Sequence, residues 1–389
     1  MNVRLLIAVL TLAGLVGCAT PPPPPPRDNL FVDEAFKPPT IRINPADALQ
    51  LSPQMQHFAD FEMRSDIRNL GPRDGLMEAL YEKGQLQLEY DSGVTRTAAE
   101  AFDARRGNCM SLVLMTAAFA RHLRVPVSFN NVVLDESWTR ANGLYFVAGH
   151  VNITLSRPPN TDSNRIVVND GEHLLIDFLP TQQLKGQRRR VIDEQTILAM
   201  YLNNRAAEAL ARGEIDDAYW WSKSAIETDP RWLAAYNTLA VLYRRHGLIS
   251  RAEFVLRTVL DREPLNTQAL SNILLVLNDQ GRQAEASIYA NQLAQVQPVP
   301  PYRFFDEGVA AMRAGDYAAA SQLFRKEIAR AAYVSEFHFW LALANYGMGD
   351  LSSAKGEIAK ALENSASVKD KELYGAKLAW LNQQRQKMH

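Results

Sequence analysis

Three residues in the middle of the chain, Cys109, His150 and Asp177, are of the types that thiol-dependent catalysis uses, and they occur in that order. In such chemistry a thiolate attacks a carbonyl carbon, an imidazole accepts the thiol proton, and a carboxylate fixes the tautomer of the imidazole. Cys109 follows Gly107–Asn108 and opens a long apolar run, so we expect it at the first position of a buried helix. The positive end of the helix dipole stabilises a thiolate at that position.

The oxyanion that forms when a thiolate attacks a carbonyl needs hydrogen-bond donors, and the backbone N–H of Cys109 is one natural donor. The side-chain amides of Asn108 and Asn152 are two further candidates. Upstream of the cysteine, Asp103 stands where a Gln would serve this purpose. The oxyanion donor is therefore the least determined part of the predicted site.

One helix and three strand regions must position these side chains. We predict a helix from Cys109 to about Leu123, strands at Val127–Leu134 and Leu144–Leu155, and a hairpin within Arg165–Leu179 that turns at Asp170–Gly171. Alternation along the second strand and the second arm of the hairpin puts His150 and Asp177 on the less apolar faces.

Simpler interpretations exist for each of these residues. His173 shares the predicted face of Asp177 and is a rival base, although a place beside the turn also fits an exposed rim histidine. His150 could be an ordinary sheet histidine and Asp177 a surface carboxylate. Cys109 could be a buried thiol on a core helix, or a redox sensor that is reversibly oxidised.

The N-terminus, "MNVRLLIAVLTLAGLVGCAT", has one Arg and a short apolar run that ends in small residues, as a secretory signal does. Its "LVGC" resembles the lipobox of bacterial lipoproteins. The resemblance implies that residues 1–17 are removed and that Cys18 carries a lipid. With Ala19 next, it also implies a place on the periplasmic side of the outer membrane of a Gram-negative bacterium. Pro21–Pro26 favour a stiff, extended spacer, and we predict a linker over residues 18–45.

If Cys18 is lipidated, the second of the two cysteines, Cys109, has no partner for an intramolecular disulfide. A free thiol is a liability in an oxidising compartment, and this favours a chemical role for Cys109.

The second half of the chain repeats with a period of 34 residues. This resembles the tetratricopeptide repeat, a helix–turn–helix unit in which Gly ends the first helix and a small Ala allows close helix packing. We predict five repeats over residues 195–368 and a capping helix over residues 369–389. The repeated positions are Gly213, Gly247, Gly281, Gly315 and Gly349, then Ala218, Ala252, Ala286, Ala320 and Ala354, and finally Pro230, Pro264 and Pro298.

The segment "AAEAFDARRGNCMSLVLMTAAFARHLRVPV" resembles the nucleophile segment of the bacterial transglutaminase-like superfamily, "AGHVNITL" its His strand and "LLIDFLP" its Asp strand. The resemblance implies an α+β, papain-like domain, which we place at residues 46–190, ahead of the all-α solenoid. It also implies that Cys109 is the nucleophile, His150 the general base and Asp177 the orienting carboxylate. Members of this superfamily are mostly thiol proteases, amidases or acyl-transfer enzymes, and some are inactive.

We therefore expect a lipid-anchored thiol hydrolase or acyltransferase that acts on peptide or amide bonds, with repeats that recruit a protein partner. The alternative is a non-catalytic envelope scaffold whose transglutaminase-like domain only binds peptides. The net charge of −1, from 42 basic and 43 acidic residues, argues against nucleic acid as a partner. No pair of histidines stands at ligand spacing with a third ligand, so we expect neither a metal nor another cofactor.

Overall fold

The computed structural model describes residues 30–82, 88–91, 93–133, 138–141, 144–147, 149–157, 173–178, 188–332, 334–365 and 368–387. The predicted signal sequence, Cys18 and the polyproline run lie outside these residues, as does the predicted Asp170–Gly171 turn.

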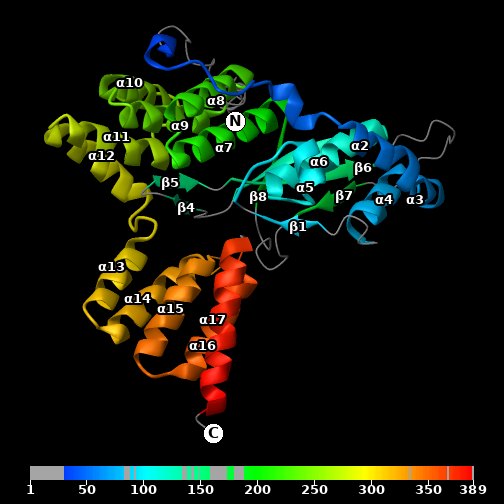
Figure 1. The fold of residues 1–389 in the computed structure, drawn as a ribbon. Coiled ribbons are helices and arrows are strands. Elements are labelled where there is room, and N and C mark those ends of the chain that lie inside the picture. Colours follow the sequence, from blue (N-terminus) through cyan, green and yellow to red (C-terminus); the bar gives the residue numbers. More distant parts are fainter. Residues whose placement is uncertain are drawn as a thin grey trace, which may run out of the picture.

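A four-stranded antiparallel sheet and one buried helix form the α/β part of the chain (Figure 1). The helix, α6, spans Cys109–His122, and every side chain from Met110 to Ala120 is buried. The buried side chains of β6 that alternate from Val151 to Leu155 share one hydrophobic core with α6. The predicted helix that begins at Cys109 is confirmed. The strands lie in the order β7–β6–β3–β8, with bounds β3 Val127–Val133, β6 His150–Ser156, β7 His173–Ile176 and β8 Arg188–Ile192.

The prediction of one continuous strand over Leu144–Leu155 is wrong. The chain forms β5 at Leu144–Val147, which pairs only with β4 at Trp138–Ala141, and then enters the main sheet as β6 at His150. Gly149 lies between the two strands and belongs to neither. A glycine inside a strand pattern has no side chain to pack, so the pairing can end and restart there.

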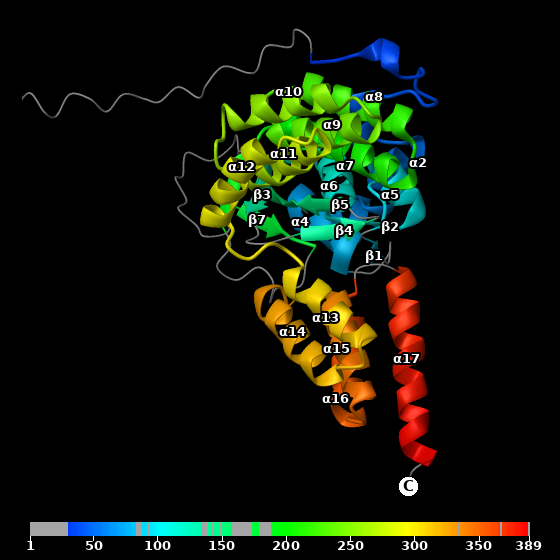
Figure 2. The same ribbon diagram turned by 90° about the vertical axis from the view of Figure 1, so that its left-hand side faces the viewer.

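The turn η1 Asp33–Ala35 lies against the solenoid, and the remaining described elements of the α/β part are short helices and strands around α6 (Figure 2). They are η2 Pro45–Leu49, α2 Pro53–His57, the π turn η3 Phe58–Glu62, α3 Arg64–Leu70, α4 Pro72–Met77, the π turn η4 Glu78–Glu82, β1 Glu89–Tyr90, α5 Ala98–Ala104 and β2 Arg106–Gly107.

Paired antiparallel helices make up the second half of the chain and confirm a solenoid of the tetratricopeptide-repeat type. Each repeated glycine has a positive φ, between 71° and 85°, and ends the turn between two helices. The repeated alanines are at most 5% exposed, as close helix packing requires. The helices are α7 Glu194–Arg212, α8 Ile215–Thr228, α9 Leu233–Arg245, α10 Ile249–Leu260, α11 Thr267–Asp279, α12 Gln283–Val296, α13 Arg303–Arg313, α14 Tyr317–Arg330, α15 Ser335–Gly347, α16 Leu351–Glu363 and α17 Val368–Lys387.

The hydrophobic core does not stop at the predicted domain boundary near residue 190. One cluster runs from Leu30 through α6 and the sheet to Ala286 in α12, whereas α13–α17 have separate cores. The interruption follows α12, where Pro298, Pro300 and Pro301 cannot continue a helix. Figure 1 shows α13–α17 as a group below the rest of the molecule, so the first three repeats pack as one body with the α/β part.

The prediction that residues 18–45 are a linker is wrong for its second part. Leu30 is 1% exposed and Phe36 is 7% exposed, and both belong to the main core. The apolar residues between the polar positions of this segment pack on the solenoid, which composition alone did not reveal. We call residues 30–40 the strap.

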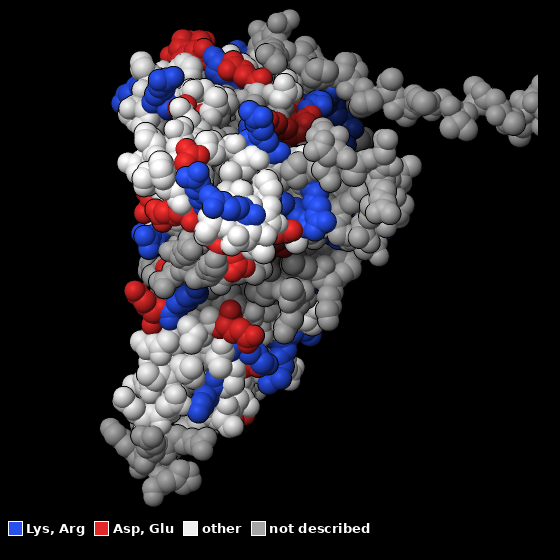
Figure 3. All heavy atoms as spheres, turned by 90° about the vertical axis from the view of Figure 1, so that its right-hand side faces the viewer, with Lys and Arg blue, Asp and Glu red and all other residues white. Residues whose placement is uncertain are grey.

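The charged surface is mixed. On the face drawn in Figure 3, basic and acidic side chains are interspersed rather than gathered by sign. Among the described helices, none combines the length and the apolar character that crossing a membrane requires.

The helix contacts within α13–α17, which we call the lower repeats, predict opposite effects on stability for two Gly→Ala substitutions. A methyl group at Gly308 in α13 would lie 2.7 Å from the ring of Phe324, which is fully buried and cannot move aside. We expect Gly308→Ala to destabilise α13–α17 by about 1–3 kcal/mol through overpacking. Gly356 in α16 has nothing within 4 Å, so Gly356→Ala should stabilise by roughly 0.5–1 kcal/mol through helix propensity. Urea unfolding followed by circular dichroism measures both changes, and equal effects of the two variants would contradict this packing argument.

Candidate active site

The structure brings Cys109, His150 and Asp177 together. Cys109 is the first residue of α6, His150 is the first residue of β6, and Asp177 directly follows β7. The His150 Nε2 atom lies 2.7 Å from Asp177 Oδ1, and the same imidazole is close enough to the Cys109 thiol for each to shift the pKa of the other. The His150 side chain is 3% exposed and that of Asp177 is 7% exposed, so the contacts are shielded from water.

Strand register fixes the carboxylate. Ile153 of β6 pairs with Ile176 of β7, so the next antiparallel pair sets Asn152 opposite Asp177. The Asn152 amide donates to Asp177 Oδ2 at 2.8 Å, and the Asn130 amide of β3 donates to Asn152 Oδ1 at 2.9 Å. Both oxygens of the Asp177 carboxylate are therefore held, and the carboxylate orients the imidazole from a fixed position.

The two amides predicted as oxyanion donors have other contacts. Asn108 is the N-cap of α6: its Oδ1 accepts from the backbone N–H of Ser111 at 2.9 Å, and its Nδ2 donates to Thr95 Oγ1 at 2.8 Å. Asn152 donates to Asp177, as described above. These contacts give a capping role to one amide and an orienting role to the other, and neither supports the predicted oxyanion role.

The charge state of the site follows from its contacts. Burial raises the pKa of the Cys109 thiol, but hydrogen bonding to His150, the charge of that imidazole and backbone N–H groups outweigh burial and lower the pKa. Burial lowers the pKa of His150, but hydrogen bonds to Asp177 and Cys109 raise it to about 9. Both shifts act in the same direction, toward a thiolate beside an imidazolium.

Tyr90 is a site residue that sequence reasoning missed. It lies in β1, which pairs in parallel with β2 so that Tyr90 is in register with Gly107, just before the cysteine. Its phenol lies beside Cys109: burial and the neighbouring thiol raise the pKa of the phenol well above its usual value. No sequence signal identifies a two-residue strand, so only the fold places this hydroxyl on the nucleophile.

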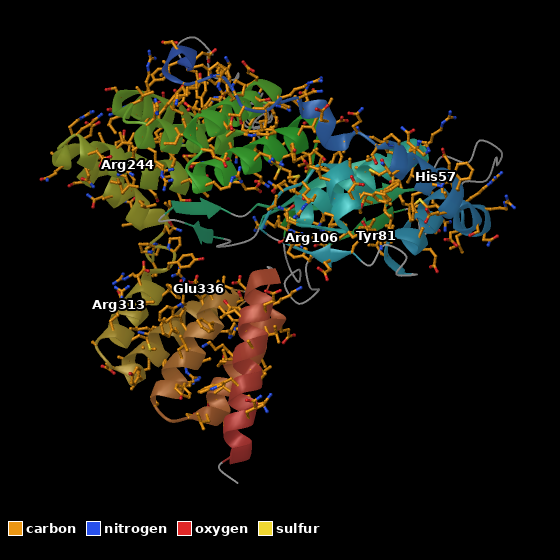
Figure 4. The ribbon with its side chains drawn as sticks, in the orientation of Figure 1. His57, Tyr81, Arg106, Arg244, Arg313 and Glu336 are labelled. Carbon is orange, nitrogen blue, oxygen red and sulfur yellow. The ribbon has the colours of Figure 1, made fainter. Side chains whose placement is uncertain are left out.

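A small residue is required two positions before α6. A Cβ atom at Gly107 would lie 2.6 Å from Ser111 Cβ in the first turn of α6. A larger residue there would shift that turn and the Cys109 side chain with it. Tyr81 of η4, whose hydroxyl lies 2.5 Å from Thr116 Oγ1, and Arg106 of β2 flank the same helix (Figure 4).

The first solenoid helix contacts the loop that supports the site. Thr95, whose hydroxyl accepts from the N-cap Asn108, donates its own backbone N–H to Glu208 of α7 at 2.7 Å. Arg205 of α7 donates to the Thr95 carbonyl at 3.0 Å. Side chains of the repeats thus hold both backbone groups of the residue that steadies the N-cap of α6.

The rival base His173 lies away from the thiol. It pairs with Ser156 at the far end of β6, and its Nδ1 lies 2.9 Å from the Ser156 hydroxyl. His150 stands at the opposite end of the same strand. In the described part of the chain, no group of three His, Cys, Asp or Glu side chains could hold a metal ion.

Two surface hollows of about 570 and 540 Å³ lie elsewhere. The first is lined by residues of α2, η3 and α5, such as His57 and Phe102, and the second by residues such as Arg42 and Trp221. Neither hollow is lined by Cys109, His150 or Asp177, so the thiol, imidazole and carboxylate lie apart from both.

No family model matches the chain, and no curated protein does. Among solved structures, the repeats resemble TTC0263, a thermophilic TPR protein of Thermus thermophilus, with 21% identity and a TM-score of 0.30 over 46% of this chain and 99% of that one. They also resemble a MamA protein, with 18% identity and a TM-score of 0.25 over 44% of this chain and 93% of that one. MamA from Desulfovibrio magneticus RS-1 is similar at 17% identity and a TM-score of 0.25, covering 43% and 94% of the two chains. At these scores the likeness carries no argument about function, and the solenoid is established by the period and helix pairs of this chain itself.

Proposed function

We propose that this protein is a thiol hydrolase or acyltransferase of the transglutaminase-like type, acting on peptide or amide bonds, whose repeats recruit a protein partner. The observation that carries the proposal is the contact of the Cys109 thiol with an imidazole that is fixed by a doubly held carboxylate. Structural ion pairs also perturb pKa values, but they seldom set a thiol at a helix N-terminus against such a pair.

The proposed reaction begins when the Cys109 thiolate attacks the carbonyl carbon of the scissile amide. A C–S bond forms, and the carbonyl electrons move to oxygen. When the tetrahedral intermediate collapses, the C–N bond breaks and the His150 imidazolium gives its proton to the leaving nitrogen. Water or an acceptor amine then attacks the thioester, His150 takes the proton of the attacking group, and the C–S bond breaks to return the thiolate.

The oxyanion of that intermediate is stabilised by the Cys109 backbone N–H together with the Tyr90 hydroxyl. The phenol lies beside Cys109. In the proposed step the substrate carbonyl oxygen lies against the Cys109 N–H, and the Tyr90 hydroxyl donates to the new oxyanion.

The proposal also includes a lipid anchor at Cys18 and a place on the periplasmic side of the outer membrane. It rests there on the "LVGC" lipobox resemblance and on Ala19 after the cysteine. The repeats provide the surface for a protein partner, which is the usual role of helical solenoids of this kind.

The proposal is tested by trapping the acyl-enzyme. In a chain that begins at residue 19, Cys109 is the single cysteine. Incubation with p-nitrophenyl acetate should add one acetyl group at Cys109, detected by intact and peptide mass spectrometry. His150→Ala should slow acylation by at least ~100-fold because the proton acceptor is lost. His173→Ala is the matched control and should stay within about twofold, since that ring lies at the far end of the sheet. An acylation rate that His150→Ala leaves unchanged would overturn the proposal.

Tyr90→Phe tests the oxyanion role by itself. If the hydroxyl donates to the oxyanion, its removal should slow acylation by about 10–100-fold, with the fold and melting temperature retained. The acylation rate of the wild type and variant, measured by release of p-nitrophenolate, checks this. A faster reaction in Tyr90→Phe would mean that the phenol only obstructs the site.

One observation favours a second candidate, a non-catalytic scaffold that binds peptides. The Tyr90 phenol lies beside Cys109, whose backbone N–H an oxyanion would need. If the phenol occupies that N–H permanently, the wild type keeps an acidic Cys109 thiol but forms no acyl-enzyme, and only Tyr90→Phe is acylated. The acylation experiment therefore separates the two candidates.

A further inference from the structure

The strap is bound through its main chain. It lies along the outer side of α8–α10 (Figures 1 and 2), and six of its backbone groups pair with side chains of the solenoid. The donors to strap carbonyls are Tyr243 Oη to Leu30 at 2.8 Å, His246 Nε2 to Ala35 at 3.0 Å and Trp220 Nε1 to Lys37 at 2.7 Å. The acceptors from strap N–H groups are Tyr219 Oη from Val32 at 3.0 Å, Asp216 Oδ1 from Lys37 at 3.1 Å and Asp217 Oδ1 from Thr40 at 2.7 Å.

Two strap side chains are bound specifically. The Phe36 ring stacks on Tyr219, with centroids 3.9 Å apart and planes within 5°, and on His246 at 4.5 Å. The Asp33 carboxylate accepts from Tyr219 Oη at 2.5 Å and lies 2.6 Å from Lys223 Nζ. Tyr219, Lys223 and His246 thus contact an acidic residue and the aromatic residue that follows it by three positions.

We propose that this face of the solenoid is a binding groove for short peptides with an acidic residue three positions before an aromatic residue, and that the strap is its resident ligand. Side chains that pair with successive backbone groups of a bound segment are a feature of peptide recognition. The turn η1 sets the spacing between the Asp33 carboxylate and the Phe36 ring, so a competing segment would bind in the same turn. The partner predicted for the repeats is therefore a protein that presents such a segment and competes with the strap. This inference does not depend on the thiol chemistry of Cys109.

The strap competes better than any external peptide because it is part of the same chain as the groove. It continues into η2, where Ala48 and Leu49 are buried against α6 and α7, so its local concentration at the groove is high. A free peptide is therefore expected to bind only when the strap's own contacts are weakened. The same connection means that displacement of the strap loosens the segment between the nucleophile helix and the first repeat.

The test uses the chain from residue 19 with a double substitution in the strap, Asp33→Ala with Phe36→Ala, which leaves every groove residue intact. A fluorescent peptide of residues 30–41 is titrated and followed by anisotropy. We expect binding to the double variant and at least ~tenfold weaker binding to the wild type, whose groove is filled. A peptide carrying Phe36→Ala should bind at least ~tenfold more weakly than the natural peptide, because stacked aromatic anchors dominate such contacts.

Groove specificity is tested in the same background. Tyr219→Phe removes the hydroxyl that contacts Val32 and Asp33 and should weaken peptide binding several-fold. Tyr236→Phe is the matched control, because its hydroxyl donates to the Pro230 carbonyl of the solenoid itself. If the double variant does not fold, Asp33→Asn alone, which keeps all aromatic packing, takes its place. The proposal is overturned if the folded strap variant does not bind the peptide, or if it binds the Phe36→Ala peptide equally well. This holds whatever the acylation experiments show.

Discussion

Cys109 will react with iodoacetamide at a pH well below the range of an ordinary thiol, and His150→Ala will abolish this behaviour. Only the thiolate is alkylated, so the rate against pH reports the pKa of the thiol. In the wild type the imidazole lowers that pKa against the opposing effect of burial. Without the imidazole, burial dominates and raises the pKa. Each unit of increase cuts the thiolate fraction about tenfold at a pH below the pKa, so a loss of roughly 10–100-fold in rate is expected at about pH 6.5.

The controls for this experiment come from the same sheet. His173→Ala should leave the profile unchanged, because His173 contacts Ser156 at the far end of β6. Asp177→Asn should shift the profile upward, because the hydrogen bond that the imidazole donates to Asp177 helps to raise the pKa of His150 to about 9. A wild-type profile centred near the usual thiol value of about 8.5, unmoved by His150→Ala, would exclude the thiolate–imidazolium pair.

The pKa of His150 also sets an upper pH limit for any catalytic activity. Turnover needs the imidazolium to protonate the leaving nitrogen, and His150 loses its proton as the pH passes about 9. The activity is therefore expected to fall on the alkaline side at that pH, while alkylation, which needs only the thiolate, continues.

The central chemistry was accessible from the sequence because it depends on local patterns. A glycine before a long apolar run gives the buried helix of Cys109, and alternation with a polar face gives the strand of His150. The contact between Asp177 and His150 follows from antiparallel pairing of two strands that were each predicted. The 34-residue period gave the repeats for a similar reason, since each unit carries its own helix stop.

What the sequence did not provide depends on contacts between distant segments. Tyr90 reaches the cysteine through a two-residue parallel pairing, which has no periodic signal. Asn108 was predicted as a donor to an oxyanion because it neighbours the nucleophile, but a helix start needs an N-cap and uses that amide first. Leu30 and Phe36 lie in a polar, proline-containing context that suggests a linker. Their burial is explained only by contacts with Tyr219, Tyr243 and His246 of the solenoid.

The position of the core predicts where the chain can be cut. A chain that ends at residue 192 loses α7, whose Ile197, Leu202 and Leu210 are fully buried in the core shared with α6. It also loses the Glu208 and Arg205 contacts to Thr95. Burial of each large apolar side chain contributes about 1.5–3 kcal/mol, so the loss of several exhausts the roughly 5–15 kcal/mol that stabilises a typical domain. We expect this shorter chain to show no cooperative unfolding and no acidic thiol at Cys109.

A chain that ends at residue 297 should behave in the opposite way. It lacks α13–α17, whose cores are separate, and it ends after α12, in which only Ala286 is buried. The cut therefore exposes little apolar surface, and the iodoacetamide profile of Cys109 should match that of the longer chain within about twofold. Thermal melting and alkylation of both truncated chains measure the difference. Cooperative folding of the chain that ends at 192 would show that the α/β part is an independent domain. Unfolding of the chain that ends at 297 would show that the lower repeats support the catalytic core, and either result would refute the division that the packing implies.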